Sequence, residues 1–393
     1  MSFSTMSSRQ RMLAALSCQQ VDHPPCSFML YKGLLSTSRD YLDFIQRELD
    51  LGLDAYVQLP PRPPVVVSDT YNLHGLPVSF DPRVIVREWK EELPGERWPV
   101  LVKEYDTPAG VLRTEVNQDA EWPYGDHVPF LDDYIETRSR KFLIDRQDDL
   151  TALKFLLIQP TSSEVAAYRK GAEPIIDFAR RNELLIAGGW GVGADLIGWV
   201  YGLERMMFAA YDDPDFLYEL LELIMSWNHS RMRVVLESGI DLYIKRAWYE
   251  NTDFWSPRAW RKFIYPGLKA DAVLAHSYGA KLGYLITANC MPLIESIVDA
   301  GVDVIIGVDP AKWDLAATKK FVAGRACLWG GVNGHLTVEQ GEVEQVQQEV
   351  HDALQILAPG SGFILSPVDN VRVDTLQTRR NVQVLLDTWR SFR

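Results

Sequence analysis

The strongest constraint on the fold is a regular alternation of short apolar runs with helical patterns. Each run has the length of a strand and is bounded by Gly or Asp, which is typical of strands buried on both faces of a parallel sheet. The second half of the chain contains such runs at 240–246, 281–287, 302–308, 326–332 and 362–366. Helical patterns follow them at 257–278, 290–300, 313–323, 341–357 and 376–392.

The first half of the chain supplies the remaining units of this alternation. Further strand candidates lie at 25–30, 54–59 and 183–189. Helical patterns accompany them at 39–51, 203–210 and 213–238. Eight successive strand–helix units predict an α/β fold, and specifically a closed (β/α)8 TIM barrel rather than an open sheet. We therefore expect the 393 residues to form one barrel domain, 1–393, because α/β barrels often exceed the usual domain length.

Residues 60–145 interrupt the alternation with Pro-rich turns and with segments whose apolar residues alternate. The segments 84–89, 100–105 and 111–116 have the period of strands, and Thr107-Pro108-Ala109-Gly110 predicts a hairpin turn between the last two. We expect a β-rich insertion at 60–145, after the second strand and packed over one end of the barrel.

Charge and composition exclude several classes of partner. Lys and Arg number 40 against 53 Asp and Glu, a net charge of −13. Nucleic acids and anionic membranes require basic surfaces, so neither is an expected partner. No 18-residue apolar run predicts a membrane span, and residues 1–18 lack the apolar core of a signal peptide. Four cysteines without a CxxC pair fit a reducing, cytoplasmic location.

Polar side chains gather where the predicted strands end, which is where (β/α)8 barrels place their chemistry. An imidazole together with carboxylates is suited to acid–base catalysis if the fold brings them within hydrogen-bond reach. The catalytic candidates are Glu250, Asp309, His335 and Asp369. The substrate-binding candidates are Lys32, Trp190, Arg246, Trp248, Tyr249, Asp253, Asn289, Asn333 and Asn370. Any one of them has a structural alternative, as a helix cap, a strand end or a core aromatic.

The sequence contains neither a zinc motif nor a convincing nucleotide motif. HxxxH, HxH, CxxC and HExxH spacings are absent, so no metal ligands are predicted, and Cys290 is expected to be an inert buried thiol. Gly189-Trp190-Gly191-Val192-Gly193 lacks the third glycine of a dinucleotide loop at the required spacing, so we reject it as a dinucleotide site.

Short stretches along almost the whole chain follow one known pattern. They are Val21-Asp22-His23-Pro24-Pro25, Gly202-Leu203-Glu204, Asp213-Pro214, Ser256-Pro257, Tyr265-Pro266, Met291-Pro292-Leu293-Ile294, Ala300-Gly301-Val302-Asp303, Gly330-Gly331-Val332-Asn333 and Gly362-Phe363-Ile364-Leu365-Ser366-Pro367 with Asn381. In this order they resemble the uroporphyrinogen decarboxylase superfamily, which includes that decarboxylase and zinc-dependent methyltransferases acting with corrinoid proteins. The resemblance implies a (β/α)8 barrel and, by analogy with the decarboxylase, a homodimer.

Departures from the pattern narrow the function that the resemblance implies. The decarboxylase grips substrate carboxylates with arginines in a segment that here reads Met29-Leu30-Tyr31-Lys32-Gly33, and Lys32 alone cannot form the bidentate fork of an arginine. Uroporphyrinogen is therefore an unexpected substrate. The zinc ligands of the methyltransferases correspond to 285–288 and 366–370, where Cys and His are absent, so zinc is not expected either.

Methyl transfer from a small donor to a corrinoid protein is the function that best survives these departures, a methoxylated aromatic being one candidate donor. The chain lacks the Asp-x-His-x-x-Gly signature of corrinoid ligation, so the corrinoid would arrive on a partner protein. Two alternatives remain open. One is a cofactor-free decarboxylase in which Arg246 or Lys32 holds a smaller carboxylated substrate, and the other is a non-catalytic ligand-binding barrel.

Overall fold

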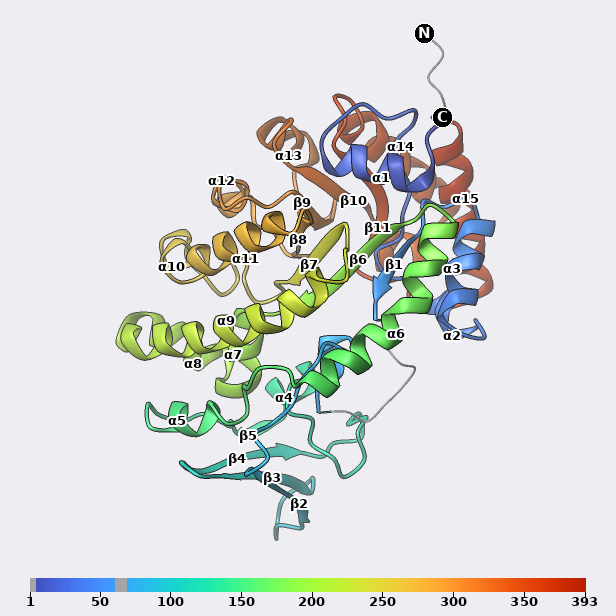
Figure 1. Cartoon of the computed structure of the whole chain (residues 1–393). Coiled ribbons are helices and arrows are strands. Elements are labelled where there is room, and N and C mark those ends of the chain that lie inside the picture. Colours follow the sequence, from blue (N-terminus) through green and yellow to red (C-terminus); the bar gives the residue numbers. More distant parts are fainter. Residues whose placement is uncertain (1–4, 61–68) are drawn as a thin grey trace.

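Parallel strands form a strongly curled sheet in the computed structural model, which describes residues 5–60 and 69–393 (Figure 1). The order in the sheet, β1-β6-β7-β8-β9-β10-β11, equals the order in the chain, as successive β–α units require. The strands are β1 (Tyr56–Leu59), β6 (Leu185–Gly191), β7 (Leu242–Arg246), β8 (Lys281–Leu285), β9 (Val304–Val308), β10 (Cys327–Asn333) and β11 (Phe363–Val368). The strand predictions from 54–59 onward are thus confirmed, with small shifts at their ends.

The first predicted strand, 25–30, does not form a strand and contributes a single parallel bridge between Cys26 and Leu365. Pro24 and Pro25 have no N–H to donate to a neighbouring strand. At Met29, the backbone bonds to side chains of the neighbouring strands instead of to their backbone. Met29 N donates to Ser366 Oγ at 3.0 Å and Met29 O accepts from the Tyr56 hydroxyl at 2.8 Å.

The same short segment nevertheless connects the two edges of the sheet. Ser27 N donates to Leu365 O at 3.0 Å on the β11 side, and Asp54 N donates to Cys26 O at 2.8 Å just before β1. The segment therefore lies between β11 and the residues that lead into β1.

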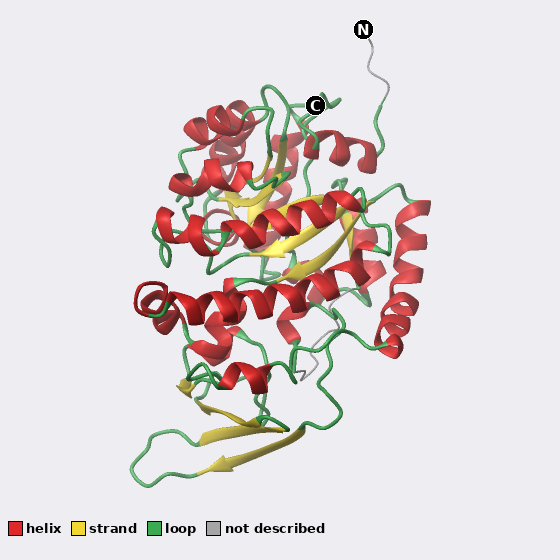
Figure 2. Ribbon diagram, turned by 60° about the vertical axis from the view of Figure 1, so that its left-hand side comes forward, coloured by secondary structure: helices red, strands yellow, loops and turns green. Residues whose placement is uncertain are grey.

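Helices cover the outside of the curled sheet (Figure 2). The helices of the described residues are α1 (Ser8–Leu16), α2 (Lys32–Ser36), α3 (Tyr41–Asp50), α4 (Asp133–Glu136), α5 (Asp149–Leu153), α6 (Ser162–Arg181), α7 (Ala194–Tyr201), α8 (Leu203–Asp212), α9 (Pro214–Leu236), α10 (Pro257–Phe263), α11 (Tyr265–Ser277), α12 (Ile294–Asp299), α13 (Leu315–Val322), α14 (Val343–Leu357) and α15 (Leu376–Arg390), of which α4 and α5 lie beside the antiparallel strands (Figure 1). Among the described residues, no helix is both long enough and apolar enough to cross a membrane.

Two differences from the predicted helices have local causes. The predicted helix 257–278 is divided into α10 and α11 before Pro266, whose missing N–H interrupts the helical hydrogen bonds. The long helix α6 was not predicted. Its start carries a capping box, in which Thr161 accepts from Glu164 N and the Glu164 side chain accepts from Thr161 N, and that signal would have located it.

A separate antiparallel sheet follows β1 in the chain and lies apart from the curled sheet (Figures 1 and 2). Its strands, in sheet order, are β2 (Ile85–Glu91), β3 (Val100–Thr107), β4 (Gly110–Asn117) and β5 (Ser139–Lys141). Thr107 pairs with Gly110 across the predicted hairpin turn. The three predicted strands of the β-rich region are therefore confirmed, while residues 61–68 of the predicted insertion lie outside the described residues.

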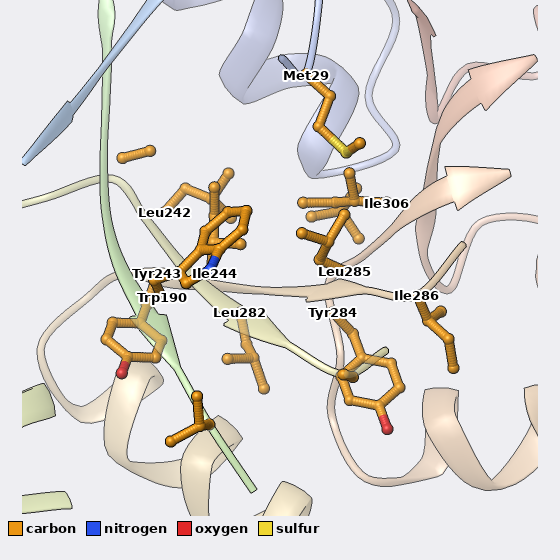
Figure 3. Packing of buried hydrophobic residues seen from close by; sticks show 14 of the residues in the cluster. Met29, Trp190, Leu242, Tyr243, Ile244, Leu282, Tyr284, Leu285, Ile286 and Ile306 are labelled. Carbon is orange, nitrogen blue, oxygen red and sulfur yellow. The ribbon is translucent and has the colours of Figure 1, made fainter. Parts of the chain in front are cut away.

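Alternate residues of the curled sheet face opposite sides of it. Figure 3 shows Met29, Trp190 and Leu285 on the inner side, while the rings of Tyr243 and Tyr284 lie on the other side, toward the helices. The inner face is tightly packed: a Cβ added to Gly283 would lie 3.0 Å from Ile306 Cδ1. This division determines which polar residues near the strand ends can share a site.

Candidate active site

A bulge at the end of β6 brings Trp190 into the interior of the sheet. The pairing with β7 shifts register between Gly189 and Gly191, and Trp190 has φ +131°, a conformation that L residues adopt only under strain of about 1–3 kcal/mol. The flanking glycines are needed because a Cβ at Gly189 or Gly191 would lie 2.7 or 2.4 Å from the Tyr243 side chain. The glycine-rich loop rejected as a nucleotide site thus shapes this bulge.

Trp190 belongs to a stack of aromatic rings and one cation. His74 stacks on it with ring centroids 4.1 Å apart and planes 12° apart, and Trp248 meets it edge to face at 6.4 Å. The Arg246 guanidinium lies 3.9 Å from the Trp248 ring centroid and 4.7 Å from that of Trp199. Ring stacking and cation–π attraction hold these side chains in one arrangement.

Arg246 is fully buried and is paired with two carboxylates. Its Nε donates to Asp195 Oδ1 at 3.0 Å, and its Nη2 donates to Asp133 Oδ1 at 2.5 Å. Asp133 Oδ1 also accepts from the Tyr249 hydroxyl and from Trp199 Nε1, both at 2.9 Å. Helix α4 is thereby anchored on the end of β7, and the Arg246 charge is largely neutralised by the protein itself.

Asp195, in the first turn of α7, is the carboxyl group best suited to proton transfer. It is fully buried. Burial raises its pKa to about 7, although the Arg246 guanidinium beside it acts in the opposite direction. A carboxyl group with this pKa holds its proton in a substantial fraction of molecules at neutral pH, which is the property of a general acid.

Unsatisfied polar atoms surround this same stack. Arg246 Nη1, Asp195 Oδ2, Trp190 Nε1 and Trp248 Nε1 are shielded from solvent and have no hydrogen-bond partner among the described residues. Buried polar groups in native proteins are nearly always satisfied, so such a concentration indicates groups reserved for a ligand.

Glu250, a predicted catalytic residue, lies behind the strands rather than among these groups. Its Oε2 accepts from the Tyr284 hydroxyl at 2.6 Å, and its Oε1 accepts from Ala194 N at 3.0 Å, at the start of α7. Lys245 Nζ, 3.7 Å from Oε1, is bonded to Asp271 at 2.9 Å. The geometry thus gives Glu250 a positioning role: it fixes the end of the helix that carries Asp195.

Three more of the predicted residues lie at or just after the ends of β9 and β10, where Asp309 and Asn333 are bonded to each other and His335 contacts Glu339 instead. Asn333 Nδ2 donates to both Asp309 carboxylate oxygens at 3.1 Å, and Asn333 Oδ1 accepts from Leu336 N. His335 is half exposed, and its Nδ1 lies 2.8 Å from Glu339. No hydrogen bond or ion pair within the described ranges joins Asp309, Asn333 or His335 to the group around Arg246.

The remaining predicted residues lie near the surface. Lys32 N donates to Asn370 Oδ1 at 3.0 Å, which joins the start of α2 to the loop after β11. Asp369, in the same loop, is exposed and has φ +70°. Asp253 and Asn289 are also exposed, and Asn289 Oδ1 accepts from Met291 N as a local turn. The structure therefore brings together Trp190, Arg246, Trp248 and Tyr249 of the predicted set.

Sequence reasoning missed the carboxylates that complete this group. Asp195 carries a weak signal, an acidic residue in the first turn after a glycine-rich strand end. Asp133 and His74 lie in the region between β1 and β6, and no local pattern connects them with Arg246 or Trp190.

A resident metal does not fit these residues. Within 5–60 and 69–393, no three His, Cys, Asp or Glu side chains are grouped as a metal ion would require. Cys290 is completely buried, and burial raises the pKa of its thiol well above the usual value, so it stays protonated.

The fold is an α/β fold, and the candidate site lies at the carboxyl ends of its parallel strands. The family model described as Uroporphyrinogen decarboxylase (URO-D) matches residues 175–392, more than half of the chain. The chain therefore belongs to the uroporphyrinogen decarboxylase family, as the sequence resemblance implied.

A solved structure of a methyltransferase shares the fold over almost the whole length of this chain. A methyltransferase from Methanosarcina mazei has a TM-score of 0.60 and 18% sequence identity, over 98% of this chain and 99% of that chain. At this identity the likeness establishes the fold alone. D-psicose 3-epimerase from Clostridium cellulolyticum H10 has a TM-score of 0.38 and 11% identity, over 58% of this chain and 86% of that one. No curated protein matches this sequence significantly.

Proposed function

We propose that this protein transfers a methyl group from a small donor to the corrinoid of a separate protein, and that the reaction takes place beside Asp195 and Arg246. The single observation that carries the proposal is the buried Asp195 carboxyl group, with a pKa of about 7 and a free Oδ2, next to the Trp190–Trp248 stack. Family membership and the fold shared with a methyltransferase support it.

The chemistry of an ether donor explains the need for such an acid. When the methyl carbon leaves, its oxygen keeps the bonding electron pair and becomes a poor, strongly basic leaving group. Asp195 Oδ2 would donate its proton to that oxygen as the bond breaks, and the product leaves as the neutral alcohol or phenol. The methyl group would pass to the corrinoid of the partner protein, which would supply the strong nucleophile.

The surroundings of Asp195 favour an uncharged aromatic donor. Trp190 and Trp248 provide flat apolar surfaces against which an aromatic ring packs well. Arg246 is already paired with the Asp133 carboxylate and bonded to Asp195, so an anionic substrate would have to compete with a resident carboxylate. A methoxylated aromatic compound meets both conditions.

We also propose the finer architecture that this function requires. The segment 25–28, bonded to β11 and to the residues before β1, takes the eighth strand position of a (β/α)8 barrel. The antiparallel strands β2 to β5 then form an insertion that brings α4 and Asp133 over the mouth of that barrel. The whole chain would function as one domain.

One observation favours decarboxylation as the second candidate function. Arg246 Nη1 has no partner among the described residues, and it could bind one oxygen of a carboxylate. Loss of CO2 would leave the bonding pair on carbon, and Asp195 would protonate that carbanion. This alternative needs no corrinoid.

A single-turnover assay distinguishes the two candidates. The purified protein is mixed with cob(I)alamin and a panel of methoxylated aromatics, and methylcobalamin is followed by its absorbance. In parallel, a panel of aromatic carboxylic acids is tested for CO2 release. We expect methylcobalamin from the wild type and a loss of about 100-fold or more in Asp195→Asn, the range of general-acid contributions.

Asp177→Asn serves as the matched control, because Asp177 is an exposed aspartate on α6. It should retain full activity. Release of CO2 without methylcobalamin would replace the proposal with the decarboxylase alternative, and an active Asp195→Asn variant would remove Asp195 from either mechanism.

A further inference from the structure

Arg231, on α9, is a completely buried cation outside the candidate active site. Its Nε donates to Pro77 O at 3.0 Å, and its guanidinium lies 4.0 Å from the Trp227 ring centroid. Nη1 and Nη2 have no hydrogen-bond partner, and no salt bridge of Arg231 occurs in the part of the chain that the structure describes. A buried guanidinium without a counter-ion is a costly arrangement.

Two further unsatisfied groups lie beside Arg231. The Tyr243 hydroxyl and Asn228 Nδ2 are buried and lack a well-aligned hydrogen bond in the described ranges, although Asn228 is close enough to act on the Tyr243 hydroxyl as a donor. Burial raises the pKa of Tyr243. Asn228 Oδ1 accepts from Val192 N at 3.2 Å, and a Cβ added to the neighbouring Gly191 would lie 2.4 Å from the Tyr243 hydroxyl. Arg231 follows Asn228 by three residues on α9, so it lies on the same face of that helix. Tyr243 lies on the side of the strands opposite to Met29 and Trp190 (Figure 3), so this cluster is separate from the Arg246 stack.

The nearby acid cannot neutralise Arg231. Asp271, the carboxylate that acts on Tyr243, is 2.9 Å from Lys245 Nζ and 2.9 Å from His229 Nε2. Its charge is therefore balanced by those two partners. Burial lowers the pKa of Arg231 to about 10, which leaves the guanidinium charged at neutral pH. Arg231 itself therefore has no ion-pair partner in the described ranges, although Glu250 lies 3.7 Å from Lys245 in the neighbouring group.

We propose that Arg231, Asn228 and Tyr243 form a buried binding site for a small monovalent anion such as chloride. Arg231 Nη1 and Nη2, Asn228 Nδ2 and the Tyr243 hydroxyl are all hydrogen-bond donors, and one anion can accept from each of them. A water molecule could satisfy some of these groups but would not supply the missing charge. The site lies between α9 and the strands β6 and β7, so the ion would stabilise that side of the fold.

The test measures thermal stability as a function of halide. The protein is purified in sodium gluconate, and Tm is followed while chloride replaces gluconate at constant ionic strength. Binding to the folded state alone raises Tm with the logarithm of ligand concentration, and we expect about 2–4 °C over a hundredfold range. The rise should disappear in Arg231→Met and be reduced in Tyr243→Phe. Arg233→Met, an exposed arginine on the same helix, should keep it.

A crystal grown in bromide provides a readout on the wild type, in case Arg231→Met does not fold. Anomalous scattering should place a bromide ion within hydrogen-bond distance of Arg231 Nη1 or Nη2. A Tm independent of chloride, ordered water in place of bromide, or an equal loss of the chloride effect in Arg233→Met would overturn the proposal.

Discussion

Asp133 Oδ1 and Arg246 Nη2 are 2.5 Å apart, although the two residues are 113 positions apart in the chain. Asp133 comes from the β-rich region between β1 and β6, and Arg246 from the end of β7. Through this bond, a carboxylate from outside the curled sheet balances the charge of Arg246, which helps to explain why Arg246 can be fully buried. The bond also holds α4 close to the aromatic stack.

Removal of Asp133 should destabilise the protein. Asp133→Ala deletes an acceptor used by Arg246, Tyr249 and Trp199, and leaves Arg246 with Asp195 as its remaining carboxylate. We expect a loss of about 2 kcal/mol in the free energy of unfolding, measured with urea. Glu136→Ala in the same short helix is the control and should change stability by no more than ~0.5 kcal/mol. Equal losses in the two variants would contradict the role of Asp133.

Asp195 should make the stability of the fold depend on pH. Its folded pKa, about 7, lies above the usual value of an aspartate, so the folded state binds more protons than the unfolded state between about pH 4 and 7. Stability from this group is therefore full below pH 4 and is lost as the pH rises through 7. Asp195→Asn removes the titration.

We accordingly expect the fall in unfolding free energy between pH 5 and pH 8 to be smaller in Asp195→Asn than in the wild type. Urea unfolding at both pH values measures the difference, with Asp177→Asn as the reference variant. An identical pH dependence in all three proteins would show that Asp195 titrates well below neutrality.

At the Trp190 bulge, a glycine variant should be more stable than an alanine variant, which is the reverse of the usual order in a helix. Both variants lose the stack with His74. The backbone at this position has φ +131°, an angle that strains alanine but not glycine. Trp190→Gly should therefore be more stable than Trp190→Ala by about 1 kcal/mol. At Trp260, in helix α10, the order should be the usual one, with alanine more stable by about 1 kcal/mol. Thermal melts of the four variants check both orders.

Glu250 should behave as a positioning residue and not as a group that touches the substrate. Glu250→Ala removes the acceptor of Ala194 N and of the Tyr284 hydroxyl, so we expect a loss of about 3 kcal/mol in unfolding free energy. Glu250→Gln, which keeps one acceptor oxygen, should lose less.

Activity provides the second readout for Glu250. In the methyl-transfer assay, Glu250→Gln should keep turnover but move the pH profile to lower pH, because the Glu250 charge contributes to the raised pKa of Asp195, which supplies the proton. A stable Glu250→Gln protein with no turnover at any pH would return Glu250 to the catalytic role that its position after β7 first indicated.

Much of the fold could be predicted because it depends on local patterns. The apolar runs from 54–59 to 362–366 form strands since a buried parallel strand needs only a few consecutive apolar residues. Position at a strand end also identified Arg246, Trp190, Trp248 and Tyr249 as neighbours. The predicted strand at 25–30 was reduced to one bridge, because Pro24 and Pro25 deprive the ladder of donors.

The sequence by itself determined the alternation of strands and helices, their order in the sheet and the edge at which polar groups collect. Only the tertiary structure decided which of those groups share a site. Glu250 faces the helices instead of the site. Asp133 and His74, which are distant in the sequence, contact Arg246 and Trp190. The pKa of Asp195 likewise depends on burial by side chains that are remote in sequence. Hydrogen bonds and desolvation act over a few ångströms of space, and no local pattern records those distances.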